Sequence, residues 1–283
     1  MLSGEATLPR AQLDADYTAR ATVSDAEFAR IIGLYQSLSD KAHDLPNPRT
    51  GLTFCPETGL KLDLFGTLKG ELRPVVVFLH GGYWRALSRA QSAFAAPLLA
   101  AHGIACAVPD YRLAPTASIT EIIMDCRRAI AWLWNNAPAL GIDRTRITVT
   151  GSSAGGHLAA AMAQPGWQEA IGLPAQPLRG CLPVSGLFEL APLAASHVQD
   201  WMHFTTEEVA QSPLRHPPQG LRGALALAAG VGEQRGFHRQ SDAFAKMTGW
   251  PVHMIADRNH FDVILDLADP DSELSKLLLD LAR

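Results

Sequence analysis

Short runs of apolar residues recur along most of the chain, with polar or mixed segments between them. Their length, and the valine and isoleucine content of several, are typical of buried strands. The runs are 75–79, 104–108, 147–150, 180–184, 224–229 and 251–255. Between them helices are predicted over 88–101, 118–137 and 156–163, and the first two open with a capping-box pattern. This alternation predicts an α/β fold, a mostly parallel sheet with helices on both faces.

The first 50 residues differ from the rest, and two further strand candidates follow them directly. Residues 52–55 and 60–65 are strand candidates that lie close enough to pair as an antiparallel hairpin at one edge of the sheet. Residues 24–44 form an amphipathic stretch that opens with a Ser-Asp-Ala-Glu capping box, and Pro46 and Pro48 stop it. The stretch predicts a helix laid over the body of the protein.

One segment between two strand candidates breaks the alternation. Residues 187–220 contain Trp201, Phe204, four prolines and three histidines. An insertion at the end of a strand is where a lid or cap over a site is placed. We therefore expect a single domain over residues 1–283, with an N-terminal helical segment (1–50) and a small helical cap (187–220). We also expect the N-terminal helix to close over the site.

Composition and charge exclude several classes of protein. The 24 basic and 28 acidic residues give a net charge of −4, which argues against a nucleic-acid binder. Hydrophobic residues make up 47% of the chain, enough for a sizeable core. The longest uncharged apolar run, about nine residues near 93–101, is far shorter than a membrane span.

The cysteines and the N-terminus indicate a reducing compartment. The spacing of the four cysteines matches neither a zinc site nor a secreted disulfide framework, so free buried thiols are predicted. Residues 1–10 show no signal-peptide pattern. We expect a cytoplasmic protein that acts on a small molecule and binds neither nucleic acid nor membrane. The sequence leaves a homodimer open.

The strongest local motif is Gly-Ser-Ser-Ala-Gly at 151–155. It follows a strand candidate and precedes an alanine-rich helical segment, the context of the nucleophile elbow in an α/β-hydrolase fold. Glycines relieve the crowding of such a sharp turn, and the helix start favours negative charge near the serine. The motif predicts Ser153 as a nucleophile, whereas Ser152 lacks the flanking glycines.

A serine nucleophile needs a base that an acid orients. In this fold the chain order is serine, then a carboxylate, then histidine. That order favours His260, in the loop after the last strand candidate. Glu233, just beyond the preceding strand candidate, is the expected acid, and Asp257 and Asp262 are its rivals. His157 is expected to be structural.

Acyl transfer also needs hydrogen-bond donors for the oxyanion. The His-Gly-Gly-Tyr-Trp motif that begins at His80 follows a strand candidate and matches the oxyanion loop of esterases and lipases. We expect Gly81, Gly82 and Tyr83 in the oxyanion hole, together with Ala154. The backbone N–H groups of Gly82, Tyr83 and Ala154 are the expected donors. His80 is then a structural residue and not a base.

Three motifs together resemble the hormone-sensitive-lipase-like branch of the α/β hydrolases. They are His-Gly-Gly-Tyr-Trp at 80–84, Asp-Tyr-Arg-Leu-Ala-Pro at 110–115 and Gly-Ser-Ser-Ala-Gly-Gly-His at 151–157. Within that branch, tryptophan at the fifth position of the first motif is the mark of the kynurenine formamidase group. Further similarity to this group lies at 184–193, 237–241 and 259–261, so the resemblance covers roughly residues 15–280.

The resemblance implies that Ser153 is the nucleophile, His260 the base and residue 233 the acid. The group usually has aspartate there, whereas this chain has Glu233. The animal enzymes often have histidine before the nucleophile, where this chain has Ser152. The implied reaction is hydrolysis of N-formyl-L-kynurenine to L-kynurenine and formate, a step of tryptophan breakdown, through an acyl-serine.

That chemistry needs a small acyl pocket and an aromatic-lined aryl side. We expect Tyr83, Trp84, Trp201 and Phe204 to border the aryl group. No metal and no cofactor are expected, because no cluster of residues has ligand spacing.

Two other functions remain open. A carboxylesterase or arylamidase for short acyl esters or amides would share every catalytic residue. A small-molecule receptor on a hydrolase fold is the second, but the gibberellin receptors that resemble this branch lack the catalytic histidine, which His260 supplies here.

Overall fold

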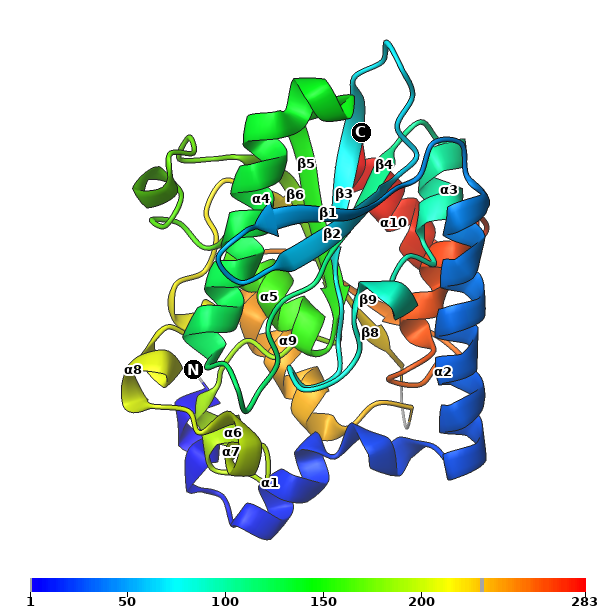
Figure 1. Ribbon diagram of the computed structural model, residues 1–283. Helices are drawn as coiled ribbons and strands as arrows, with labels where there is room; N and C mark the ends of the chain where they lie inside the picture. The colour runs from blue at the N-terminus through cyan, green and yellow to red at the C-terminus, as the bar shows by residue number, and fades with distance from the viewer. Residues whose placement is uncertain (1, 230–231) are drawn as a thin grey trace.

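The computed structural model describes residues 2–229 and 232–283 (Figure 1). Within these residues one sheet of nine strands has the spatial order β1-β2-β4-β3-β5-β6-β8-β9, and the short β7 pairs with β6. The strands are β1 (Arg49–Cys55), β2 (Leu60–Phe65), β3 (Arg73–Leu79), β4 (Ala105–Pro109), β5 (Ile142–Ser152), β6 (Leu178–Val184), β7 (Arg222–Gly223), β8 (Leu225–Ala228) and β9 (Val252–Ile255). Neighbours from β4 to β9 run parallel, while β1 and β2 form the antiparallel edge. The predicted α/β fold and edge hairpin are confirmed.

Helices cover both faces of the sheet, and β3 shows how the faces are divided. Val75, Val77 and Leu79 pack in a core with α4 (Ile119–Leu140), α5 (Ala154–Ala163) and α9 (Arg235–Thr248). Val76 and Phe78 pack in a second core with α2 (Asp25–Asp40), α3 (Ala96–Ala101) and α10 (Glu273–Ala282). Successive side chains of a strand point to opposite faces, so this continuous apolar run serves both cores.

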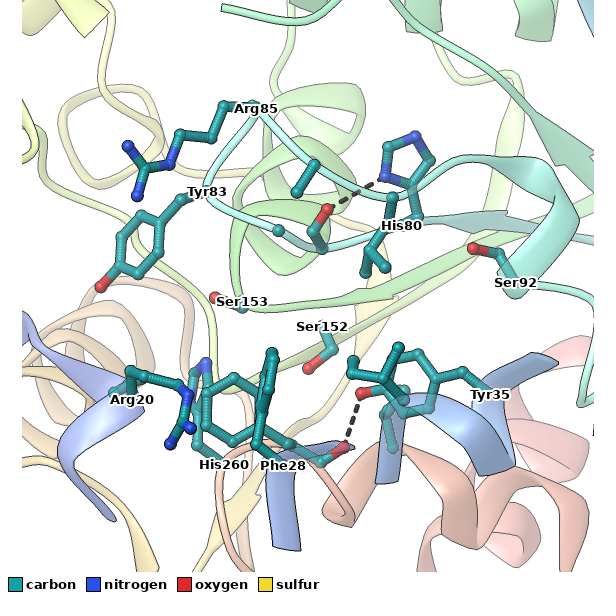
Figure 2. A pocket seen from close by; sticks show the side chains of 18 of the residues that line it. Arg20, Phe28, Tyr35, His80, Tyr83, Arg85, Ser92, Ser152, Ser153 and His260 are labelled. Carbon is teal, nitrogen blue, oxygen red and sulfur yellow. Dashed lines mark hydrogen bonds between the residues drawn. The ribbon is translucent and has the colours of Figure 1, made fainter. Parts of the chain in front are cut away.

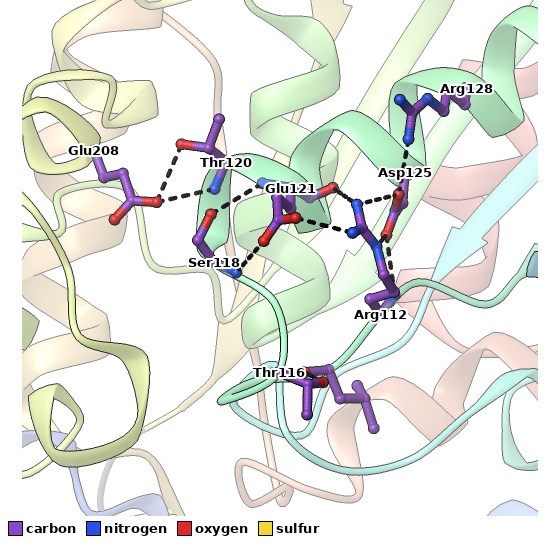
Figure 3. A network of polar contacts seen from close by, with 9 residues as sticks. Arg112, Thr116, Ser118, Thr120, Glu121, Asp125, Arg128 and Glu208 are labelled. Atoms are coloured by element: carbon purple, nitrogen blue, oxygen red, sulfur yellow. Dashed lines mark hydrogen bonds and ion pairs between the residues drawn. The ribbon is translucent and has the colours of Figure 1, made fainter. Parts of the chain in front are cut away.

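The helix starts follow the capping signals with one exception. Ser118 and Glu121 form the predicted capping box of α4 (Figure 3). The single helix predicted over 88–101 is wrong. Ser88 caps only the 3-10 turn Arg89–Gln91, and α3 begins at Ala96. Pro97 explains the late start, because proline is tolerated in the first turn of a helix and breaks its interior.

The N-terminal segment reaches two sides of the molecule: its first helical turns pack against the insertion, whereas the helix at 25–40 lies on the opposite side (Figure 1). The helix predicted over 24–44 is present as α2, which Ser24 caps, followed by the 3-10 turn Lys41–Asp44. Before it, α1 (Arg10–Tyr17) packs against α9. The insertion forms the short helices α6 (Ala191–Ala194), α7 (Gln199–Met202) and α8 (Thr206–Ala210), which join the same core as α4 and α5.

Two smaller expectations concern the cysteines and membrane spans. Cys55, Cys106, Cys126 and Cys181 are free and buried, as predicted. In the part of the chain that the structure describes, none of the helices combines the length and the apolar character needed to cross a bilayer.

Candidate active site

Ser153 stands at the junction of β5 and α5, where the chain turns sharply. Its φ of 58° and ψ of −117° are strained for a residue with a side chain. A Cβ atom on Gly155 would lie 2.0 Å from the carbonyl oxygen of Leu79, and one on Gly151 would lie 2.3 Å from the same atom. Both glycines are therefore required, because β3 passes directly beside the turn. The turn leaves Ser153 7% exposed at the start of α5.

The loop after β3 is a second strained segment beside Ser153. Gly82, Tyr83 and Trp84 have φ values of 97°, 50° and 58°. Each of their carbonyl groups accepts a hydrogen bond. The donors are the N–H of Arg85 to Gly82, the indole of Trp201 to Tyr83 at 3.2 Å, and the N–H of Ala114 to Trp84 at 2.8 Å. These bonds hold the backbone in its uncommon conformation.

The fixed backbone of this loop leaves two of its N–H groups free to bind an oxyanion. Among the described residues, no acceptor bonds to the N–H groups of Gly82 and Tyr83. Ala154 is the first residue of α5, where N–H groups have no partner within the helix. The three expected oxyanion donors thus lie on segments that flank Ser153, and a Cβ on Gly81 would come within 3.7 Å of the Ser153 Cβ. Donors held in advance of the reaction are the arrangement that stabilises an oxyanion.

His260 meets a buried carboxylate. Its Nδ1 hydrogen bonds to Oε1 of Glu233, whose side chain is fully buried. The other carboxylate oxygen accepts from the hydroxyl of Ser185 and from the N–H of Ala228 at 3.3 Å. Because the carboxylate occupies Nδ1, Nε2 is the nitrogen left for a proton from the nucleophile.

The two rival carboxylates take other positions. Asp262 accepts from the N–H of Asn259 at 2.6 Å, and Asp257 is exposed. Neither bonds to His260 among the described residues, so Glu233 is the carboxylate that the fold brings to this histidine. Ser185 was missed in the sequence. Its signal is its place directly after β6, because the carboxyl ends of parallel strands meet at one edge of the sheet.

Ser153 and His260 line one cavity of about 270 Å³ (Figure 2). Within the described residues no hydrogen bond joins their side chains. Such bonds are often long in a free enzyme and tighten when substrate binds. Much of the wall is aromatic: Phe94 packs against Phe78 at 5.0 Å and against Tyr35 at 5.4 Å between ring centroids.

Only one of the four residues expected to border the aryl group lines this cavity, namely Tyr83. The expectation is wrong for Trp84, which is fully buried beneath the loop, with ring centroids 5.2 Å from His157 and 6.0 Å from Phe204. Burying so large an apolar surface favours the core over a wet cavity. Trp201 and Phe204 do not line the cavity either.

The insertion is therefore not the cover of this cavity, contrary to its expected role as a cap. The N-terminal segment takes that place, as expected for its helix. It supplies five lining residues that the sequence did not single out: Ala19, Arg20, Phe28, Ile32 and Tyr35. The signal for Phe28, Ile32 and Tyr35 was the amphipathic pattern of 24–44, which marks a helix face but not what it faces. Ala19 and Arg20 precede that stretch, and no pattern in the sequence marked them.

Two buried histidines near the site are structural. His80 stacks on Tyr111 and bonds through Nδ1 to the carbonyl of Gly81 at 3.0 Å. His157 bonds through Nδ1 to the carbonyl of Leu187 at 2.6 Å. Burial lowers the pKa of each to about 4, so both are neutral near pH 7. In residues 2–229 and 232–283 no group of three or more His, Cys, Asp or Glu side chains is placed to hold a metal ion.

Comparisons with known proteins point to one class. The family model described as BD-FAE matches residues 62–172. A solved structure from Silicibacter, to which a thioesterase function is ascribed, is 27% identical with a TM-score of 0.79 and covers 94% of this chain and 98% of its own. The carboxylesterase EstE1 from a metagenomic library has a TM-score of 0.70 at 20% identity, over 92% and 95% of the two chains. The protein has the α/β-hydrolase fold.

Within this class one resemblance extends over most of the chain. A kynurenine formamidase from Salmo salar is 28% identical over 257 residues, 85% of this chain and 84% of the relative. The resemblance to kynurenine formamidases in the hormone-sensitive-lipase-like branch is thereby confirmed. These relatives support a hydrolytic enzyme.

Proposed function

We propose that this enzyme is a serine hydrolase that cleaves the formamide of N-formyl-L-kynurenine, or of a similar aryl formamide, in the cytoplasm. The observation that carries the proposal is the meeting of Ser153, the His260–Glu233 pair and the free N–H groups of Gly82 and Tyr83 at one aromatic-walled cavity. The similarity to kynurenine formamidases supports the substrate.

The first half of the reaction forms an acyl-enzyme. Ser153 Oγ attacks the formyl carbon while Nε2 of His260 takes the hydroxyl proton. The negative charge on the carbonyl oxygen is held by the N–H groups of Gly82, Tyr83 and Ala154. Glu233, at Nδ1, stabilises the imidazolium. The carbon–nitrogen bond then breaks, and the imidazolium protonates the departing aryl amine.

The second half returns the free enzyme. His260 takes a proton from water, whose oxygen attacks the formyl-serine. The same N–H groups hold the second oxyanion. The ester bond breaks, the proton returns to Ser153, and formic acid leaves and ionises to formate in solvent. His260 carries each proton that moves within the site, so this route needs no metal or cofactor.

Steady-state kinetics on N-formyl-L-kynurenine and on 4-nitrophenyl acetate test the proposal. We expect efficient turnover of the formamide and a loss of about 10⁵-fold or more in kcat for Ser153→Ala. Ser152→Ala, which removes the neighbouring hydroxyl, is the matched control and is expected to keep far more activity. A kcat/KM on the formamide several decades below that on the ester would overturn the substrate.

The second candidate is a carboxylesterase or arylamidase for short acyl groups. The likeness to EstE1 in fold favours it. Turnover of the ester that depends on Ser153, with negligible turnover of the formamide, would select this function. The assignment of Ser153 as the nucleophile would then be retained, and the formamide substrate would be rejected.

A further inference from the structure

Arg85 is a cation at the cavity without a partner in the described residues. Its guanidinium lies 3.8 Å from the ring centroid of Trp201, and the side chain is exposed. No hydrogen bond or ion pair to the guanidinium occurs within residues 2–229 and 232–283, although the backbone N–H of Arg85 donates to Gly82. The indole that it covers is itself fixed, because its N–H donates to the carbonyl of Tyr83. A cation–π contact with the Trp201 ring, and not an ion pair with a carboxylate, therefore positions the guanidinium.

The charges that line the cavity all have one sign. Arg20 and Arg85 are lining residues, and no aspartate or glutamate is among the described lining residues. Arg20 is already engaged, by the carboxylate of Asp25 and by the carbonyl of Val23 at 2.7 Å. Arg85 keeps its full set of donors for a ligand. In the view of Figure 2, Arg85, Tyr83 and Arg20 lie along one side of the cavity, and Tyr35 lies on the other.

We propose that Arg85 binds a carboxylate on the part of the substrate that leaves with the amine. This inference rests on the proposed function and names its substrate class, an aryl formamide that carries a carboxylate. An arginine fork matches a carboxylate with two parallel hydrogen bonds, and the absence of acidic lining residues removes competition for it. The aromatic wall around Phe94 takes the aryl ring at the other end of the cavity.

Matched substrates test the subsite. 3-Formamidobenzoate carries the carboxylate, and 3-formamidobenzamide is its neutral counterpart. We expect wild type to prefer the anion by about tenfold in kcat/KM, the size of a charge-assisted hydrogen bond. Arg85→Gln is expected to remove this preference. Raising the ionic strength is expected to weaken it in wild type, because the arginine is exposed.

Arg144→Gln is the matched control. Arg144 is another exposed arginine, 5.4 Å from the ring centroid of Trp134, and it does not line the cavity. This variant is expected to keep the wild-type preference. A wild type without preference, or a preference that survives Arg85→Gln, would overturn the proposal. A loss that also appears in Arg144→Gln would assign it to overall charge and overturn it as well.

A second series separates this inference from the formamidase proposal. 3-Acetoxybenzoate and 3-acetoxybenzamide present the same pair of leaving groups to an esterase. Preference for the anionic ester that depends on Arg85, without formamide turnover, would retain the subsite and reject the formamidase. Calorimetry with 3-aminobenzoate and 3-aminobenzamide on Ser153→Ala needs no turnover. Weaker or equal binding of the anion there would reject the subsite whatever the reaction.

Discussion

The N-terminal segment and the 187–220 insertion both add helices and aromatic residues to the same sheet, yet only one of them covers the cavity. From the N-terminal segment, α2 places Phe28, Ile32 and Tyr35 on the cavity wall. The insertion supplies no described lining residue, and its Phe204 packs against Trp84 beneath the oxyanion loop instead. An insertion at the carboxyl end of a strand reaches the edge where the site lies, but its place in the chain does not decide which side it fills.

The apolar pattern of α2 explains its role. Phe28, Ile31, Ile32 and Tyr35 recur with helical spacing and form one stripe. Ile31 is buried in the second core, and Tyr35 is buried there while also reaching the cavity wall. Phe28 and Ile32 are only partly buried and face the cavity. The stripe is wider than the core requires, and the excess becomes a binding surface.

The largest effect is expected for Trp84→Ala, at the contact between the oxyanion loop and the insertion. The fully buried indole contacts Phe204 and His157, so its removal leaves a cavity. We expect the free energy of unfolding to fall by about 3–5 kcal/mol, measured by urea denaturation. The KM of the folded fraction should change little. A large rise in KM without a loss of stability would show that Trp84 contacts substrate after all.

The next effect is the pH dependence of stability through His157, which bonds to the insertion at Leu187. Burial lowers its pKa from 6.5 to about 4. Between these values the unfolded chain binds a proton that the folded chain does not, so stability falls as the pH drops from 6.5 to 4. The loss is about 3 kcal/mol for one such histidine.

Urea unfolding at several pH values between 4 and 7 measures this slope. His157→Gln is expected to flatten it, and the exposed His216→Gln is the matched control. An unchanged slope in His157→Gln would mean that this histidine does not contribute to acid destabilisation.

The smallest effect belongs to the N-terminal side, with Phe28→Ala. Phe28 is only partly buried, 5.0 Å from the ring of Phe261 between centroids. We expect KM for the aryl substrate to rise about tenfold at nearly constant kcat, from the loss of one apolar contact. Stability should change by less than about 1 kcal/mol, because the site is partly solvated. Phe204→Ala should do the reverse, and equal effects of the two variants on KM would break the distinction between the segments.

Much of the fold was predictable because it depends on local signals. The strands appeared as apolar runs, and the capping box at Ser118 marked the start of α4. The helix predicted from Ser88 failed because a capping pattern is also compatible with a short turn, and Pro97 delays the helix that follows.

The candidate site was predictable where a motif constrains backbone geometry. The glycines around Ser153 and the His-Gly-Gly motif encode close approaches and positive φ values that other residues do not adopt without strain. The partner of His260 was expected as Glu233 from chain order, with two rivals left open. The folded structure distinguishes the three carboxylates, because Glu233 is the one that bonds to Nδ1 of His260. Its other oxygen accepts a hydrogen bond from the hydroxyl of Ser185.

By itself the sequence determined the class of fold, the two strained turns and the residues that they present, because each follows from a local pattern of apolar positions and glycines. Only the tertiary structure decided that α2 and not the insertion lines the cavity, that Trp84 is buried and that no carboxylate of the described residues pairs with Arg85. Those outcomes depend on which apolar surfaces meet across long separations in the chain. The type of a side chain determines whether it favours burial against an apolar surface, but not which surface it packs against.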